Sequence, residues 1–187
     1  MKNPPTKTDN FEISKKIYLR REGTEHLKDL CVLDLFAGEN KLWKSFEKNT
    51  YYGIEIEKGK GKNVTGDNLK VIPSLDLSRF NVIDCDAYGI PCPQINALFR
   101  NGTMQPGTVV FYTAIRNGLS GQSKDLTKEL GIEDMYKKAP TLFKNVAFDA
   151  FYHCLFRHGI RTVHEYEVQD RTFMKKYGYF VYVEQKS

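Results

Sequence analysis

Five short apolar segments recur between residues 31 and 113, and each is typical of a buried β-strand. Between them, apolar residues at helical spacing predict helices over Lys41–Lys48 and Pro93–Arg100, and a single helical turn over Leu69–Ile72. Strands that alternate with helices in this way form a parallel sheet, with right-handed crossovers that place helices on both faces. The five predicted strands are Cys31–Phe36, Tyr51–Ile56, Lys62–Thr65, Phe80–Asp86 and Thr108–Thr113.

The C-terminal part of the chain departs from this alternation. Residues 116–140 are polar and contain several glycines, which predicts an irregular, partly helical excursion. Thr141–Arg157 carries one continuous apolar stripe and predicts a helix that ends just before Gly159. Arg161–Val168 and Tyr177–Val183 are β-rich and predict a terminal antiparallel hairpin. A short helix is expected between residues 11 and 30, before the first strand.

Length and composition favour one domain over residues 1–187, with residues 1–10 as a flexible tail. The 187 residues, 41% hydrophobic and 27% charged, suffice for a core without a metal or disulfide. No stretch approaches the roughly 20 apolar residues that span a bilayer, and the N-terminus lacks the apolar segment of a secretory signal. Four cysteines without a C-x-x-C pair indicate reduced thiols. We therefore expect a cytoplasmic protein with no membrane association and no metal site.

An acidic residue stands at the end of each of the first four predicted strands, where ligands bind in open α/β sheets. Asp34 opens the first strand-end loop, which runs to Asn40, and its Ala37-Gly38 turn lets the backbone approach a ligand. A dinucleotide fingerprint would need G-x-G-x-x-G, and this loop has a single glycine. The loop therefore argues against NAD.

The second and third strand ends suit the two halves of a nucleoside. Glu55 follows Asp34 by 21 residues and is placed to accept hydrogen bonds from both ribose hydroxyls, with Glu57 as the competing candidate. Asp67 is placed to accept from an adenine amine, and Asn68 to offer its backbone N–H. The alternative for Asp67 is a helix N-cap.

The fourth strand end, Asp84-Cys-Asp-Ala-Tyr-Gly-Ile-Pro-Cys-Pro93, is the most informative. Its glycine and prolines fix a rigid loop. Asp86 is placed to bind the N–H of a target amine and to take up its developing positive charge, and Tyr88 to stack on a planar base. The alternative is a turn that merely happens to be acidic. That alternative is weak, because two desolvated carboxylates cost free energy unless they have partners.

In order and spacing, these four motifs resemble those of the class I S-adenosyl-L-methionine (SAM)-dependent methyltransferases over about Cys31–Ala114. The resemblance implies a Rossmann-like α/β fold, with a mostly parallel seven-stranded sheet, a C-terminal antiparallel hairpin and helices on both faces. It implies SAM as the cofactor. The residues that it assigns to the cofactor are Asp34, Phe36, Ala37, Gly38, Asn40, Glu55, Asp67, Asn68 and Asp86.

Within that superfamily, Ile83–Pro91 resembles the Asp-Pro-Phe-Gly-Ser-Pro segment of the tRNA guanine-N2 dimethyltransferases. This implies that Asp86 is catalytic, that Tyr88 lies beside the target base, and that the acceptor is an exocyclic amine of a nucleic-acid base, with RNA favoured. Asn40 departs from the family's second glycine and Ala87 from its proline. Two alternatives stay open: a methyltransferase for a small molecule or protein, and a SAM-fold binding module without catalysis.

Other candidate features are less specific. Pro91-Cys92 superficially supplies the nucleophile of a cytosine-C5 methyltransferase, but Cys85 and Cys92 are better explained as packing residues. The net charge of +5 permits a polyanionic partner. The basic residues form either a nucleic-acid track or a solvated surface, and the sequence supports the two interpretations about equally. They are Lys41, Lys44, Lys48, Lys58, Lys60, Lys62, Arg116, Lys124, Lys128, Lys137 and Lys138.

Overall fold

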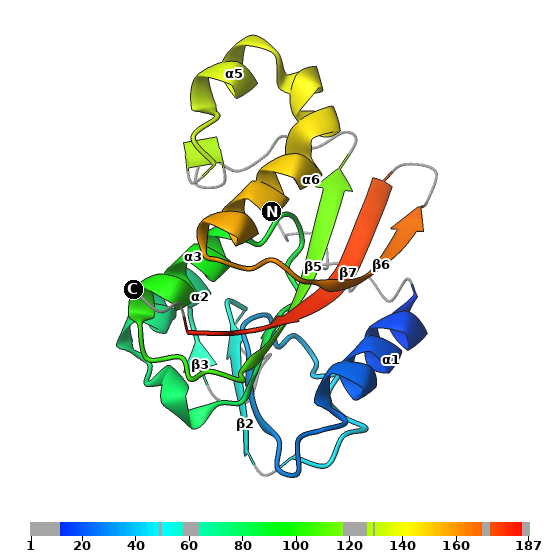
Figure 1. Ribbon diagram of the computed structural model, residues 1–187, viewed down its shortest axis with the longest axis vertical. Helices are drawn as coiled ribbons and strands as arrows, with labels where there is room; N and C mark the ends of the chain where they lie inside the picture. The colour runs from blue at the N-terminus through cyan, green and yellow to red at the C-terminus, as the bar shows by residue number, and fades with distance from the viewer. Residues whose placement is uncertain are drawn as a thin grey trace.

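A seven-stranded sheet in the order β3-β2-β1-β4-β5-β7-β6 forms the centre of the computed structural model (Figure 1). The structure describes residues 12–48, 50–57, 64–117, 127–128, 130–169 and 173–184. Neighbouring strands among the first five pair in parallel, and β7 pairs antiparallel with both β5 and β6. This confirms the predicted α/β sheet and its C-terminal hairpin. The strands are β1 (Cys31–Asp34), β2 (Thr50–Glu55), β3 (Val64–Thr65), β4 (Val82–Cys85), β5 (Val109–Asn117), β6 (His164–Gln169) and β7 (Phe173–Val181).

Helices cover both faces of the sheet, as expected (Figure 1). On one face α1 packs against β5 and β7, and Leu19 of α1 joins the core formed around Val82 and Phe111. On the other face α3 and α6 complete a second core, to which Ile95 and Phe151 contribute. The helices are α1 (Ile13–Thr24), α2 (Asn68–Val71), α3 (Cys92–Asn101), α5 (Glu133–Lys138) and α6 (Pro140–Arg157), with 3₁₀ turns η1 (Ile72–Ser74) and η2 (Leu77–Arg79).

The pleat of the strands decides which side chains face α1. Successive residues of a strand point to opposite faces, so Val82 joins the core on the α1 side and Ile83 joins the core beneath α3 and α6. The same alternation turns the carboxylates of Asp34 in β1 and Asp84 in β4 toward α1. The α1 face of the sheet therefore carries buried acids at the carboxyl ends of its strands.

The predicted helix over Lys41–Lys48 does not form, and this segment folds as a series of turns. Trp43 is fully buried, packs edge-on against Phe111 and donates its indole N–H to Asp84 at 2.7 Å. The Lys48 ammonium donates to the carbonyls of Trp43 and Phe46 and so ties the end of this segment to its own turns. Tertiary contacts of one tryptophan thus outweigh the local helical spacing.

The last helix and its end match the sequence pattern. α6 begins at Pro140, a residue suited to a first helical turn, and ends at Arg157. Gly159 has φ +73° just beyond it, and the N–H of Ile160 bonds the carbonyl of Leu155 at 3.1 Å. α5 confirms that the polar excursion is partly helical. Residues 118–126 of that excursion and the expected tail over residues 1–10 lie outside the described residues.

Candidate active site

Three carboxylates line the α1 face at the carboxyl ends of β1 and β4. The register of the two strands pairs Asp34 with Asp84, so the two acids are direct neighbours. Asp86 follows Asp84 by two residues and faces the same helix. Asp34 is 4% exposed and Asp84 is fully buried, whereas the side chain of Asp86 keeps 18% exposure. Of the three, Asp86 is the one that a ligand can reach most easily.

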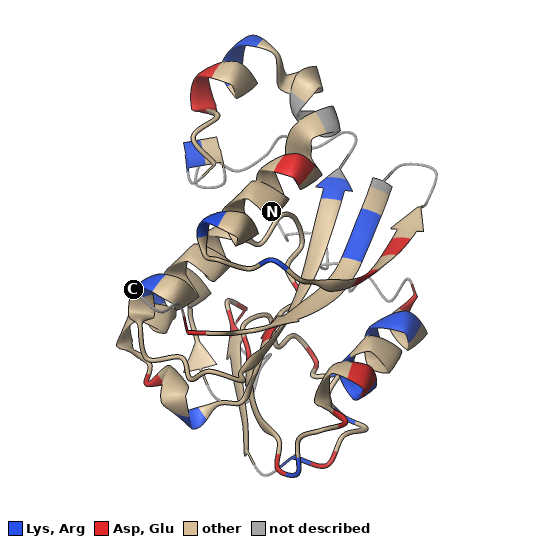
Figure 2. Cartoon of the chain, in the orientation of Figure 1, with Lys and Arg blue, Asp and Glu red and all other residues tan. Residues whose placement is uncertain are grey.

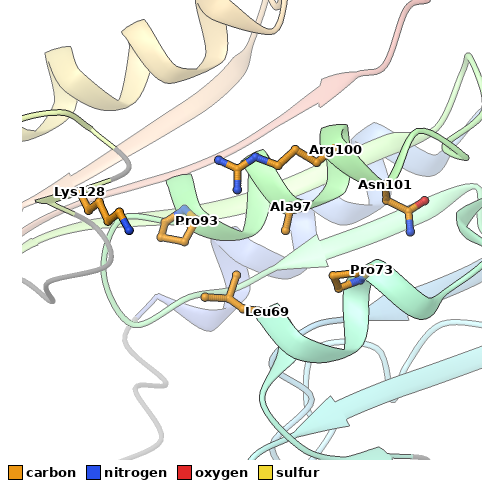
Figure 3. A pocket seen from close by; sticks show the side chains of 7 residues that line it. All are labelled: Leu69, Pro73, Pro93, Ala97, Arg100, Asn101 and Lys128. Carbon is orange, nitrogen blue, oxygen red and sulfur yellow. The ribbon is translucent and has the colours of Figure 1, made fainter.

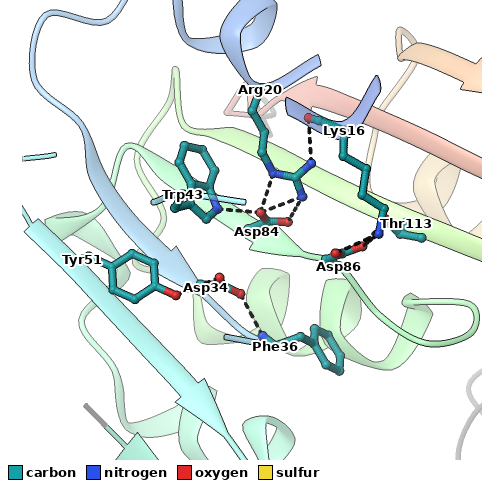
Figure 4. Close-up of polar contacts among 9 residues, drawn as sticks. All are labelled: Lys16, Arg20, Asp34, Phe36, Trp43, Tyr51, Asp84, Asp86 and Thr113. Carbon is teal, nitrogen blue, oxygen red and sulfur yellow. Dashed lines mark hydrogen bonds and ion pairs between the residues drawn. The ribbon is translucent and has the colours of Figure 1, made fainter. Parts of the chain in front are cut away.

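Two cations from α1 neutralise these acids (Figure 4). Arg20 donates two hydrogen bonds to the Asp84 carboxylate, from Nε at 2.8 Å and from Nη2 at 2.7 Å. Lys16, one helical turn earlier, donates from Nζ to both oxygens of Asp86, at 2.7 and 2.9 Å. A spacing of four residues places both side chains on one face of the helix. The acids thus have the partners that their burial requires, and sequence reasoning missed both.

Neutral donors complete the coordination of each carboxylate. Asp34 accepts from the Tyr51 hydroxyl at 2.9 Å and from the backbone N–H of Phe36 at 3.0 Å. The Thr113 hydroxyl donates to Asp86. These bonds fix the orientation of the carboxylates before any ligand arrives.

The three acids differ in protonation. Burial, together with the negative charge of Asp84, raises the pKa of Asp34 to about 8. Burial also acts to raise the pKa of Asp86, but the charges of Lys16 and Arg20 outweigh it and hold that pKa below its usual value. Burial also raises the pKa of Asp84, although the charge of Arg20 and the hydrogen bonds from Arg20 and Trp43 act to lower it. At neutral pH the site therefore presents Asp86 as an ionised carboxylate.

Glu55 at the end of β2 is bound to the loop that follows β1. Its Oε2 accepts from the N–H of Gly38 at 2.9 Å, and its Oε1 accepts from the N–H of Glu57 at 3.1 Å. Gly38 and Asn40 both have left-handed backbones, with φ of +48° and +56°. Asparagine tolerates this region better than most residues, so Asn40 holds the left-handed turn of the loop at little conformational cost.

Asp67 and Asn68 at the end of β3 serve the protein's own backbone. Asp67 caps α2 by accepting from the N–H of Leu69 at 3.0 Å, which is the alternative role expected for it. The buried Asn68 amide donates to the carbonyl of Leu35 at 2.9 Å and ties α2 to the first strand-end loop. Contacts of Asp67 and Asn68 with an adenine ring stay a prediction.

The loop after β4 projects Tyr88 into solvent. Tyr88 is 74% exposed, an unusual position for a large aromatic side chain. The loop is tied to the sheet by a 2.7 Å bond from the N–H of Ile115 to the carbonyl of Gly89. Cys85 and Cys92 are fully buried, and burial raises the pKa of the Cys85 thiol, as suits packing residues.

A small cavity of about 70 Å³ lies among the β1 loop, α1 and Asp86. Lys16 and Ile13 of α1 line it together with Asp34, Gly38 and other residues of the loop. A larger hollow of about 400 Å³ lies between α2, η1 and α3, where Figure 3 shows Pro93 and Ala97 opposite Leu69 and Pro73. None of the strand-end acids lines the larger hollow. We place the candidate active site at the smaller cavity, because the ionised groups meet there.

The basic residues do not gather on one element. Figure 2 shows Lys and Arg spread over α1, α5, β5, β7 and several loops. Lys41 pairs with Glu39 at 2.8 Å, and Lys48 binds backbone carbonyls. Lys58, Lys60, Lys62 and Lys124 lie outside the described residues. The spread favours neither the nucleic-acid track nor the solvated surface.

Within the residue ranges that the structure describes, no group of three or more His, Cys, Asp and Glu side chains is arranged to hold a metal ion. None of the helices in these ranges combines the length and apolar character needed to cross a bilayer.

Comparison with known proteins finds similarity in structure alone. No protein-family model matches the chain, and no curated protein matches its sequence. The N-methyltransferase NodS from Bradyrhizobium japonicum superposes with a TM-score of 0.55 at 10% identity, over 95% of this chain and 99% of that one. Precorrin 8w decarboxylase from Methanobacterium thermoautotrophicum gives 0.51 at 14% identity, over 88% of each chain. TYW2 from P. horikoshii gives 0.51 at 13%, over 88% of this chain and 62% of that one. With its strand order, this likeness shows that the chain has the Rossmann-like fold of class I methyltransferases.

Proposed function

We propose that this protein is a SAM-dependent methyltransferase that acts on an exocyclic amine of a nucleic-acid base, with RNA as the favoured substrate. The observation that carries the proposal is the carboxylate of Asp86 in the wall of the small cavity, beside the loop that follows β1, where Lys16 and Arg20 hold its pKa low. That arrangement puts a proton acceptor next to the place where the fold binds its ligands. The exposed Tyr88 two residues later supplies a surface for a planar base.

The residues at the strand ends fit the cofactor. Glu55 would bind the ribose hydroxyls, Asp67 and Asn68 the adenine, and the loop from Asp34 to Asn40 the methionine part. Asn40 Oδ1 is a buried acceptor without a hydrogen-bond partner among the described residues, which suits an N–H donor on a ligand. When bound, SAM supplies a methyl group already activated on a sulfonium.

The protein's own contribution is to position the acceptor amine and to neutralise the positive charge that develops on it. Asp86 would hold the acceptor amine by an N–H···O bond and take its proton as positive charge develops. Holding the amine within about 3–3.5 Å of the methyl carbon, in line with the bond that breaks, supplies much of the rate. The fold accommodates amine-directed transfer, since NodS is described as an N-methyltransferase.

The test is transfer of tritium-labelled methyl from SAM to total RNA, DNA and protein, with SAM affinity measured in parallel. Asp86→Asn keeps the shape but removes the charge, so we expect turnover to fall by about 10²-fold or more with SAM binding nearly unchanged. Asp149→Asn, at an exposed position of α6, is the matched control and should transfer at the wild-type rate.

Each other outcome selects another function. Label in protein or in small molecules alone would replace the nucleic-acid acceptor by one of those classes. SAM binding without transfer to any acceptor would favour a non-catalytic binding module. Wild-type turnover by Asp86→Asn would make Asp86 structural and would refute the proposed role.

A further inference from the structure

The ammonium of Lys16 sits in a site that is built for an amine. Its Nζ contacts both oxygens of Asp86, at 2.7 and 2.9 Å, and lies 5.0 Å from the centre of the Tyr177 ring. A carboxylate and an aromatic face are the two groups that bind amine cations most readily in proteins. Thr113 donates to the same carboxylate and fixes its orientation. Asp86, Thr113 and Tyr177, which come from three different segments, thus form one subsite.

We propose that Asp86, Thr113 and Tyr177 form the subsite for the acceptor amine and that the Lys16 side chain occupies this subsite in the free protein. This proposal rests on the proposed function. The Nζ of Lys16 makes the N–H···O contacts with Asp86 that the acceptor's nitrogen makes during transfer. Lys16 and the acceptor therefore compete for one carboxylate. In this form α1 closes the active site, and the acceptor enters only when Lys16 withdraws.

The size of the cavity supports closure by α1. About 70 Å³ is open beside the β1 loop, whereas binding sites for small molecules and cofactors span about 300–1,000 Å³. Ile13 and Lys16 from the start of α1 form part of the cavity wall. Withdrawal of these two residues would enlarge the site without any change in the sheet.

The later part of α1 is anchored, which confines the movement to the start of the helix. Arg20 is bound to Asp84 in the protein interior, and Leu19 is 1% exposed in the core. A side chain at Gly23 would approach the Phe111 ring to 2.8 Å, so this turn of the helix lies tightly against the sheet. The ion pair between Lys16 and Asp86, which we call the latch, therefore holds only the start of α1, while the later part of the helix stays in place.

The test compares wild type with Lys16→Met, which keeps the buried stem and removes the charge. Lys15→Met is the matched control, because Lys15 is the neighbouring residue and its side chain is 47% exposed, paired with Glu12 at the surface. Amide hydrogen exchange over Ile13–Leu19, without any ligand, reports whether the latch holds the helix start. Calorimetry with SAM reports whether the latch closes the site. Asp86→Asn removes the other half of the ion pair and provides a second variant for the exchange measurement.

We expect faster exchange over Ile13–Leu19 in Lys16→Met and in Asp86→Asn than in wild type or Lys15→Met. We also expect Lys16→Met to bind SAM at least about fivefold more tightly, because the apparent affinity of a protein rises with its binding-competent fraction. Unchanged exchange would overturn the latch. Faster exchange with unchanged or weaker SAM binding would overturn the claim that the latch closes the site. If no protein in the set binds SAM, the proposed function fails and the subsite assignment with it, while the exchange data still decide whether Lys16 holds the helix.

Discussion

Arg20→Met removes the guanidinium that neutralises Asp84 and should destabilise the protein strongly. Both side chains are at most 2% exposed, so water cannot replace the lost partner without local unfolding. The methionine keeps most of the apolar stem that packs near Trp43 and Phe111. The change therefore removes the charge, its two hydrogen bonds to Asp84 and a third bond, from Nη1 to the Lys16 carbonyl at 3.0 Å.

The size of the effect follows from the geometry. Two hydrogen bonds to a charged group contribute about 1.5–3 kcal/mol each, and breaking a buried ion pair costs about 3–5 kcal/mol in the free energy of unfolding. Asp84 keeps the bond from the Trp43 indole, which favours the lower half of that range. The total free energy of unfolding of such a domain is about 5–15 kcal/mol, so the loss is large but leaves a measurable native state.

Protonation of Asp84 sets an upper limit on one part of the loss, the free energy of leaving its charge buried without a partner. The folded variant can neutralise Asp84 at about 1.4 kcal/mol for each pH unit above about 3.9, which amounts to about 4 kcal/mol at pH 7 and about 1.5 kcal/mol at pH 5. The charge of Arg20 lowers the pKa of Asp84, so without it burial raises that pKa further than in the wild type, and the folded variant binds more protons than the folded wild type. Its stability relative to wild type therefore falls as pH rises from 5 to 7.

The assay is urea unfolding followed by circular dichroism at pH 5 and pH 7. Arg21→Met, at the exposed neighbouring residue, is the control and should change stability by no more than about 0.5 kcal/mol. Arg20→Met combined with Asp84→Asn leaves no buried charge and should recover part of the loss. If Arg20→Met is as mild as Arg21→Met, or if its loss is equal at both pH values, the reasoning about this ion pair is wrong.

Four further predictions concern protonation, cofactor and substrate. Because the folded pKa of Asp34 is about 8, the wild-type free energy of unfolding should fall by up to about 1.4 kcal/mol per pH unit between pH 5 and 8. Asp34→Asn should remove most of that slope, and an equal slope in wild type and variant would contradict this. Glu55→Ala should weaken SAM binding by up to about 1.5–3 kcal/mol per lost bond, whereas a larger loss in Glu57→Ala would transfer the ribose contact to Glu57. Tyr88→Ala should weaken RNA binding by about 1–3 kcal/mol if a base stacks there, and equal affinity in a filter-binding assay would refute the stacking. RNA affinity should fall at least about tenfold between about 50 and 200 mM salt, and an RNA affinity that does not change with salt would favour a small-molecule acceptor.

The sequence by itself determined where the parallel strands lie along the chain and which of them end in an acid. Short apolar runs such as Cys31–Asp34 and Val82–Cys85 are local patterns that mark buried strands. Strands that alternate with helices pair in parallel through right-handed crossovers. Once the strands are known, Asp34, Glu55 and Asp86 must lie at the same edge of the sheet. Gly159 likewise marked the end of α6, because a left-handed residue after a helix is a local requirement.

Only the tertiary structure decided what those acids contact. In the sequence, Lys16 and Arg20 look the same as the exposed Lys15 and Arg21, and nothing local ties them to β4, more than sixty residues later. The missing helix over Lys41–Lys48 has the same origin, since the indole of Trp43 binds Asp84 across 41 residues. Local patterns record the periodicity of a segment, whereas the state of a buried carboxylate depends on the groups that folding brings within about 3 Å of it.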